Sequence, residues 1–113
     1  MITTTVNPRW QNESYTCHIE PGKSIRLTGF NRNYRKDGFS FDITFKIGDP
    51  AEYDSYNLIY IGHIVSIGPK TVTIKPRRET RTRRLDLATF AARNFNFDLA
   101  RIERENAIEL QCI

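Results

Sequence analysis

Cysteine and histidine are scarce in this sequence of 113 residues, which holds two of each. Cys17 and Cys112 permit at most one disulfide, so a disulfide framework is excluded and reduced thiols are expected, as in a cytoplasm. His18 and His63 have no partner at metal-ligand spacing, and the side chains of Cys17 and His18 should point to opposite faces of a strand. We therefore predict neither a metal site nor a cysteine–histidine nucleophile.

Long apolar runs and catalytic motifs are also missing. No run approaches the roughly 20 residues that span a bilayer, and residues 1–5 do not resemble a signal, so we expect neither membrane insertion nor export. There is no phosphate-cradling glycine loop, nucleophile elbow or kinase signature. Asp49, Glu52 and Asp54 could hold a divalent cation, but a polar loop with local hydrogen bonds is the favoured interpretation. We predict a cytoplasmic protein that is not an enzyme and has no cofactor.

The composition is that of one globular domain. Hydrophobic residues make up 39% of the chain and charged residues 27%, which is too apolar for a disordered protein. A chain of this length can bury its own core. We predict a single domain over residues 1–113, with its strands within residues 2–85.

Alternation of apolar and polar residues predicts most of these strands. The strongest signals are Phe39 to Ile47 and the hairpin Leu58 to Ile74, which a loop slightly longer than two residues interrupts at Gly68-Pro69. Weaker signals cover residues 2–6, 15–19, 24–27 and 81–85. Residues 51–57 are interpreted as a connecting loop, and His63 as a histidine in or near the core.

The pattern becomes helical toward the C-terminal end. Asp86 can cap a helix over about residues 87–93, which a left-handed Asn94 would end, and the same pattern recurs over about residues 99–105. Residues 108–113 alternate again as a candidate last strand. Five or more antiparallel strands with two short C-terminal helices predict an α+β fold, built on a bent sheet or small β-barrel.

Positive charge is concentrated in one stretch, although the whole chain carries only +4. Between residues 70 and 84, seven cations are opposed by Glu79 alone, so this stretch carries +6 and the rest of the chain −2. The seven are Lys70, Lys75, Arg77, Arg78, Arg81, Arg83 and Arg84. Such a cluster is typical of a surface that binds nucleic acid or another polyanion, because phosphate contacts release counterions. A charged hairpin that only maintains solubility is the alternative.

Aromatic residues beside cations strengthen the binding interpretation, because exposed rings next to cations suit base stacking. A secondary binding loop is predicted from Trp10, Arg32, Tyr34, Arg35 and Lys36. Tyr53 and Tyr56 are expected in loops as well. The alternative is that these rings cap the ends of a small barrel.

Two resemblances accompany these patterns. Gly62 to Ile67 followed by Lys70 to Ile74 resembles the strand-turn-strand of small SH3-like barrels, a pattern of many RNA- and protein-binding modules. The runs Ala51 to Leu58, Lys70 to Ile74 and Arg93 to Asp98 together resemble small uncharacterised accessory proteins of phages and other mobile elements. This second resemblance implies a dispensable accessory protein, such as an inhibitor of a host defence complex.

Two functions are compatible with these features. The first is a nucleic-acid-binding accessory domain, in which the basic hairpin contacts phosphates and the loop aromatics stack on bases. The alternative is a phage-type inhibitor or interaction module that blocks a host defence nucleoprotein or nucleotide-signalling enzyme, its arginines meeting an acidic protein surface. In either case a homodimer could form through a strand edge at residues 2–6 or 108–113.

Overall fold

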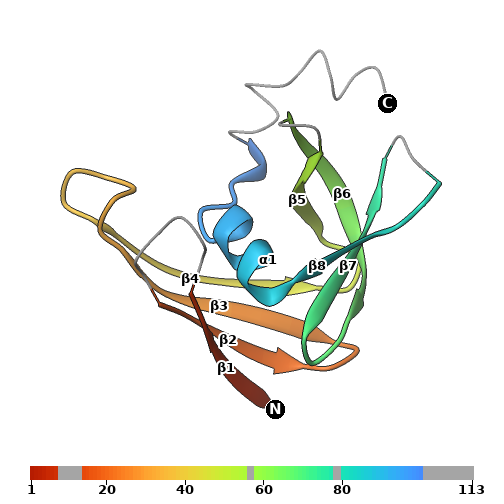
Figure 1. Cartoon of the computed structure of the whole chain (residues 1–113), viewed down its shortest axis with the longest axis horizontal. Helices are drawn as coiled ribbons and strands as arrows, with labels where there is room; N and C mark the ends of the chain where they lie inside the picture. The colour runs from red at the N-terminus through yellow and green to blue at the C-terminus, as the bar shows by residue number, and fades with distance from the viewer. Residues whose placement is uncertain (8–13, 56–57, 78–79, 101–113) are drawn as a thin grey trace.

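The computed structural model describes residues 1–7, 14–55, 58–77 and 80–100. They form two antiparallel sheets of four strands each and one helix (Figure 1). The first sheet contains, in spatial order, β1 (Ile2–Val6), β2 (Tyr15–Glu20), β3 (Ser24–Asn31) and β4 (Phe39–Lys46). The second contains β5 (Pro50–Ser55), β6 (Leu58–Ile67), β7 (Thr71–Pro76) and β8 (Arg83–Asp86), and helix α1 (Leu87–Asn94) follows it.

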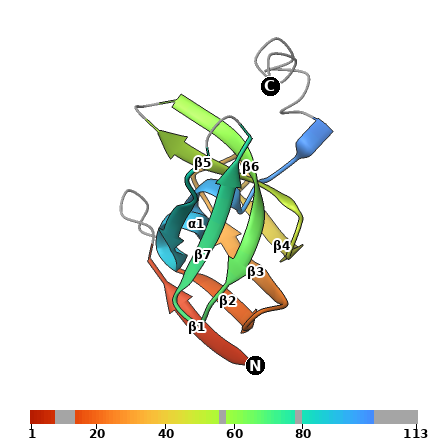
Figure 2. The same ribbon diagram turned by 90° about the vertical axis from the view of Figure 1, so that its right-hand side faces the viewer.

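Helix α1 lies between the two sheets (Figures 1 and 2) and contacts strands of both. Each layer contributes fully buried side chains to one core: Leu27 from the first sheet, Phe90 from the helix and Ile74 from the second sheet. The Phe90 ring packs edge-on against Phe45 of β4, with 5.2 Å between centroids. Truncating such a side chain to alanine costs about 2–5 kcal/mol, so these contacts hold the three layers together.

The two sheets are joined at a corner, where turns of the first sheet bond to β6. The Gly22 N–H donates to the Ile67 carbonyl and the Gly48 N–H to the Ile64 carbonyl, both at 2.7 Å. Gly22 and Gly48 have φ values of 78° and 94°, which glycine adopts without the steric penalty of a side chain. A register shift between Ile64 and Ser66 lies at the same place. Strict alternation along β6 is therefore broken there, and Val65 and Ser66 are both exposed.

The predicted fold class is wrong. The described residues are mostly β, in two four-stranded sheets with a single short helix, whereas an α+β fold with two C-terminal helices was expected. The expected helix at 99–105 lies almost wholly outside the described residues, which include only its first two positions, and the expected strand at 108–113 lies entirely outside them. The first helix is confirmed, and its Asp86 cap accepts a hydrogen bond from the Thr89 N–H at 2.7 Å.

Three smaller expectations also need correction. Residues 51–57 do not form a simple loop, because β5 runs from Pro50 to Ser55 and pairs with β6. His63 is exposed on β6 and does not belong to the core. Asn94 is the last helical residue, and Phe95, which follows it, has right-handed angles (φ −62°, ψ −26°), so no left-handed residue ends this helix.

The predicted loop between β6 and β7 is confirmed, since three residues separate Ile67 from Thr71. In the part of the chain that the structure describes, no helix has the length and apolar content needed to cross a membrane.

Candidate functional site

The β7–β8 hairpin carries most of the predicted basic cluster but divides it between two faces. Thr73 lies opposite Arg84, and Ile74 lies opposite Arg83. Because successive strand residues point to opposite faces, Arg84 shares the outer face with Thr73, whereas Arg83 shares the inner face with the fully buried Ile74. Arg84 is accordingly exposed, and Arg83 is half-buried and has a partner within the molecule.

Four cations gather toward the free end of this hairpin, and we call them the basic tip: Lys75, Arg77, Arg81 and Arg84. Lys75 and Arg84 are diagonal neighbours on the outer face, because Arg84 lies opposite the residue two positions before Lys75. Arg81 and Arg84 are exposed, and within the described residues neither forms an ion pair. Their guanidinium groups are therefore available to an external anion.

Two of the predicted cations lie away from the basic tip, and one lies outside the described residues. Lys70 is in the turn between β6 and β7, about 20 Å along the strand from Arg77. Arg83 faces inward, as described above. Arg78 falls among the residues that the structure does not describe.

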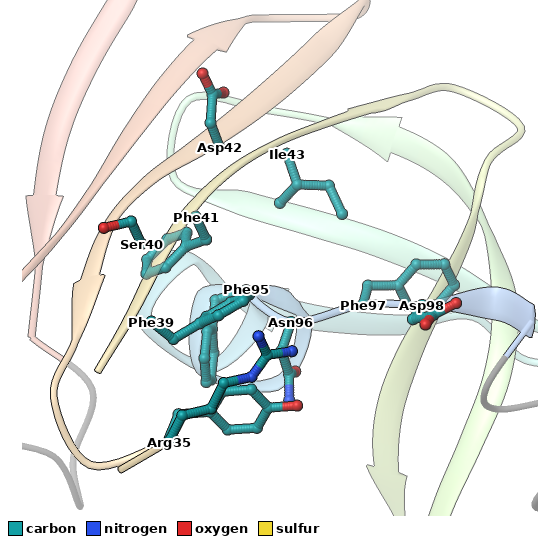
Figure 3. A pocket seen from close by; sticks show the side chains of 11 residues that line it. Arg35, Phe39, Ser40, Phe41, Asp42, Ile43, Phe95, Asn96, Phe97 and Asp98 are labelled. Carbon is teal, nitrogen blue, oxygen red and sulfur yellow. The ribbon is translucent and has the colours of Figure 1, made fainter. Parts of the chain in front are cut away.

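A second candidate surface is a cavity of about 440 Å³ beside β4 (Figure 3). Five aromatic rings line it: Tyr34, Phe39, Phe41, Phe95 and Phe97. The rings contact one another, with centroid distances of 5.0 Å for Tyr34–Phe39 and 5.3 Å for Phe41–Phe95. Its volume falls in the range of about 300–1,000 Å³ that is usual for ligand pockets.

Arg35 places a cation on this aromatic wall. Its guanidinium carbon lies 4.6 Å from the centroid of Phe39 and 5.4 Å from that of Tyr34. Figure 3 shows Arg35 beside Phe39 at one end of the cavity, and Asp98 beside Phe97 at the other. The cavity thus has aromatic rings in its walls, with the polar side chains of Ser40, Asp42 and Asn96 among them, and it carries side chains of opposite charge at its two ends.

The loop that carries Tyr34 and Arg35 is anchored to the core by Asn31. The buried Asn31 donates through Nδ2 to the Tyr15 hydroxyl at 2.7 Å, and its Oδ1 accepts from the Asn33 N–H at 2.8 Å. At the far end of the loop, Gly38 has φ 84° and lies against the Phe30 ring, where a Cβ would come within 2.1 Å of that ring. These constraints hold the loop against the cavity.

The predicted secondary binding loop is therefore divided as well. Tyr34 and Arg35 line the cavity, Arg32 and Lys36 are exposed nearby, and Trp10 lies outside the described residues. Tyr53 belongs to β5, not to a loop, and stacks on Tyr60 at 5.7 Å while only 3% exposed. Tyr56 also lies outside the described residues.

Asp42, which lines the cavity from the outer face of β4, is neutralised by Arg26. Arg26 donates from Nε and Nη2 to the two carboxylate oxygens of Asp42 at 2.7 and 2.6 Å. This ion pair lowers the pKa of Asp42 below its ordinary value. Asp98, at the other end of the cavity, also has an interaction within the molecule.

The acidic residues weighed as cation ligands do not converge. Asp49 accepts from the Lys46 N–H at 2.8 Å, Glu52 is 5% exposed, and Asp54 pairs with Arg93 at 2.9 Å. Across residues 1–7, 14–55, 58–77 and 80–100, no group of three metal-ligating side chains is found.

Sequence reasoning did not identify Phe95 and Phe97 as cavity residues. Their spacing by two residues was visible, but their place beside β4 depends on the path of the chain after α1. No family model, curated protein or solved structure matches this chain. The resemblance to phage accessory proteins accordingly stays a prediction.

Proposed function

We propose that the protein is a nucleic-acid-binding accessory domain that contacts phosphates through the basic tip. The observation that carries this proposal is the pair of exposed guanidinium groups of Arg81 and Arg84, which have no ion-pair partner within the described residues. They belong to a stretch of +6 in a chain of +4, so the charge is localised. Arginine suits this role because its planar donors can bind a phosphate through two hydrogen bonds.

The expected binding is mainly electrostatic. Phosphate contacts fix position without reading the base sequence, and no Phe, Tyr or Trp lies opposite Lys75 or Arg84, whose paired residues are His63 and Thr73. Non-specific affinities of this type have dissociation constants of about 10⁻⁴–10⁻⁶ M at physiological salt. We therefore propose weak sequence preference and strong salt dependence.

The direct test is fluorescence anisotropy with a labelled single-stranded oligonucleotide of about 16 nucleotides, and with the matching duplex. Binding should be measurable near about 50 mM salt and should weaken steeply by about 200 mM. No detectable binding of either DNA or RNA near 50 mM would refute the proposal.

The alternative uses the same guanidinium groups on an acidic protein surface, as an interaction module or inhibitor of a host complex would. A pull-down from lysate treated with nuclease separates the two. Loss of all partners after nuclease supports nucleic acid as the ligand, and retention of one protein supports the alternative. We place either activity in the cytoplasm, in line with the low cysteine content.

A further inference from the structure

We propose that the outer edge of β4 and the aromatic cavity beside it bind an extended peptide segment of another protein. The segment would pair with β4 as an added strand, place one bulky apolar side chain in the cavity and set an acidic side chain beside Arg35. This site is separate from the basic tip and does not depend on the nucleic-acid proposal.

The first argument is the position of the cavity on the backbone edge. Five consecutive residues, Phe39 to Ile43, line it. Since alternate residues of a strand point to opposite faces, only a cavity at the edge of the strand can touch all five. Among the described strands β4 is the last of its sheet, so this edge presents backbone N–H and C=O groups that no described strand pairs with.

The second argument is the regularity of this edge. β4 has eight residues in unbroken register with β3, and its sequence contains no proline, glycine or bulge. On the edge of β4 that faces away from β3, no described strand pairs with it, and no described residue forms a backbone hydrogen bond with Phe39–Phe45. By contrast, the outer edge of β5 is closed by the Asn94 side chain, which bonds to both the N–H and the C=O of Glu52. The edge of β4 is therefore a template for an added strand.

The third argument is charge. The loop over residues 32–38 carries Arg32, Arg35 and Lys36 against Asp37, a net +2, at the end of the cavity where Arg35 lies. The opposite end carries Asp98. An acidic side chain of the peptide suits the cationic end at Arg35.

Self-pairing is less suitable than a foreign peptide. If two copies paired antiparallel through the middle of β4, Lys46 of one copy would lie opposite Phe39 of the other. That register brings Lys46 toward the cationic loop that precedes Phe39, and like charges at such positions are destabilising.

The test uses a synthetic peptide of about ten residues, the upper length of ordinary strands, with alternating valine and threonine, a central tryptophan and one glutamate two positions away. Titration into isotopically labelled protein, followed by amide NMR shifts, should perturb residues 39–43 and 95–98 and leave Arg81 and Arg84 unchanged. The control is the same peptide with alternate backbone nitrogens methylated, which keeps every side chain but cannot complete the strand pairing. It should bind at least about tenfold more weakly, because buried backbone carbonyl groups of β4 would be left without hydrogen bonds.

Charge exchange provides the matched control. Arg35→Glu should weaken binding of the glutamate peptide by up to about fivefold, the magnitude expected of an exposed charge pair, and should strengthen binding of the corresponding lysine peptide. Arg84→Glu should change neither. Three results would overturn the proposal. The methylated peptide could bind as tightly as the unmodified one, or the protein alone could form concentration-dependent dimers that shift the amide signals of residues 39–43. The third is that a thymidine oligonucleotide, and not the peptide, shifts those signals.

Discussion

Asn94 is the buried polar residue that joins α1 to the edge of the second sheet. Its Oδ1 accepts from the Glu52 N–H at 2.8 Å, and its Nδ2 donates to the carbonyls of Glu52 and Phe90 at 3.1 Å each. The side chain has no exposure to solvent. A single amide thus satisfies both outward backbone groups of an edge strand and one carbonyl in the last turn of the helix.

Replacing Asn94 should therefore be costly. We expect Asn94→Ala to lower the free energy of unfolding by about 2–4 kcal/mol, because three hydrogen bonds are lost and buried backbone groups are left without partners. Asn94→Asp should be worse, since a carboxylate oxygen would face two carbonyl oxygens. Urea unfolding followed by circular dichroism measures both changes. A loss below about 1 kcal/mol in the alanine variant would contradict this role.

Cys17 makes the stability of the fold depend on pH in the alkaline range. It is fully buried on β2, and burial raises the pKa of its thiol from 9.0 to about 11. Between these values the unfolded chain ionises while the folded chain keeps its proton. The stability that this thiol contributes is therefore fully present below about pH 9 and is lost as the pH rises toward 11.

The comparison with Cys17→Ala isolates that effect. Relative to the variant, the natural protein should lose up to about 1–2 kcal/mol of unfolding free energy between about pH 8 and pH 10.5. Denaturant titrations at the two pH values measure the difference, and lysine and tyrosine titrations cancel because both proteins share them. A difference that stays constant with pH would contradict the burial of the thiol.

At the scale of elements, the sequence predicted the structures that depend on neighbouring residues, and it did not predict those that depend on contacts between distant residues. The alternation of Phe39 to Lys46, the turn at Gly68-Pro69 and the Asp86 cap depend on neighbouring residues, and each is present in the structure. The strand at Pro50–Ser55 was missed, because Pro50 and a run without apolar alternation resemble a loop. Its pairing with β6 and its closure by Asn94, 42 residues away, supply what the local sequence lacks.

Replacing two adjacent arginines of β8 should have different effects on stability, because Arg83 and Arg84 point to opposite faces of the β7–β8 hairpin. Arg84→Ser removes an exposed side chain and should change stability by less than about 0.5 kcal/mol. Arg83→Ser removes a half-buried side chain on the face of Ile74 and should cost more, about 1 kcal/mol. Thermal melting of the two single variants compares them under identical conditions. An equal loss in both would mean that the inner and outer faces have been assigned incorrectly.

At the scale of the whole molecule, the seven cations that the sequence places together do not form one surface. Lys70 and Arg77 lie at opposite ends of β7, and Arg83 points to the inner face of the sheet. Neither fact can be read from the spacing of these residues in the sequence. The cavity was unpredictable for a related reason, because Phe95 and Phe97 reach β4 only after the chain has passed through four more strands and α1.

The two candidate surfaces are far apart. Figure 1 shows the loop between β3 and β4 and the end of the β7–β8 hairpin on opposite sides of α1. Such separation would let the protein hold a nucleic acid and a protein segment at the same time. The two proposals can therefore be tested independently, with variants of one surface serving as controls for the other.

The most direct measurement of the central claim is the salt dependence of nucleic-acid affinity in two charge-matched double variants. Arg81→Ser with Arg84→Ser removes two exposed cations from the basic tip, and Lys23→Ser with Lys46→Ser removes two exposed cations from the first sheet. Fluorescence anisotropy at several salt concentrations gives the slope of log affinity against log salt for each protein. The tip variant should lose about 0.7–0.9 in the magnitude of the slope for each phosphate contact removed, up to about 1.8 in total, while the Lys23 and Lys46 variant keeps the natural slope. Equal slopes in both variants would show that phosphates are not bound at the basic tip.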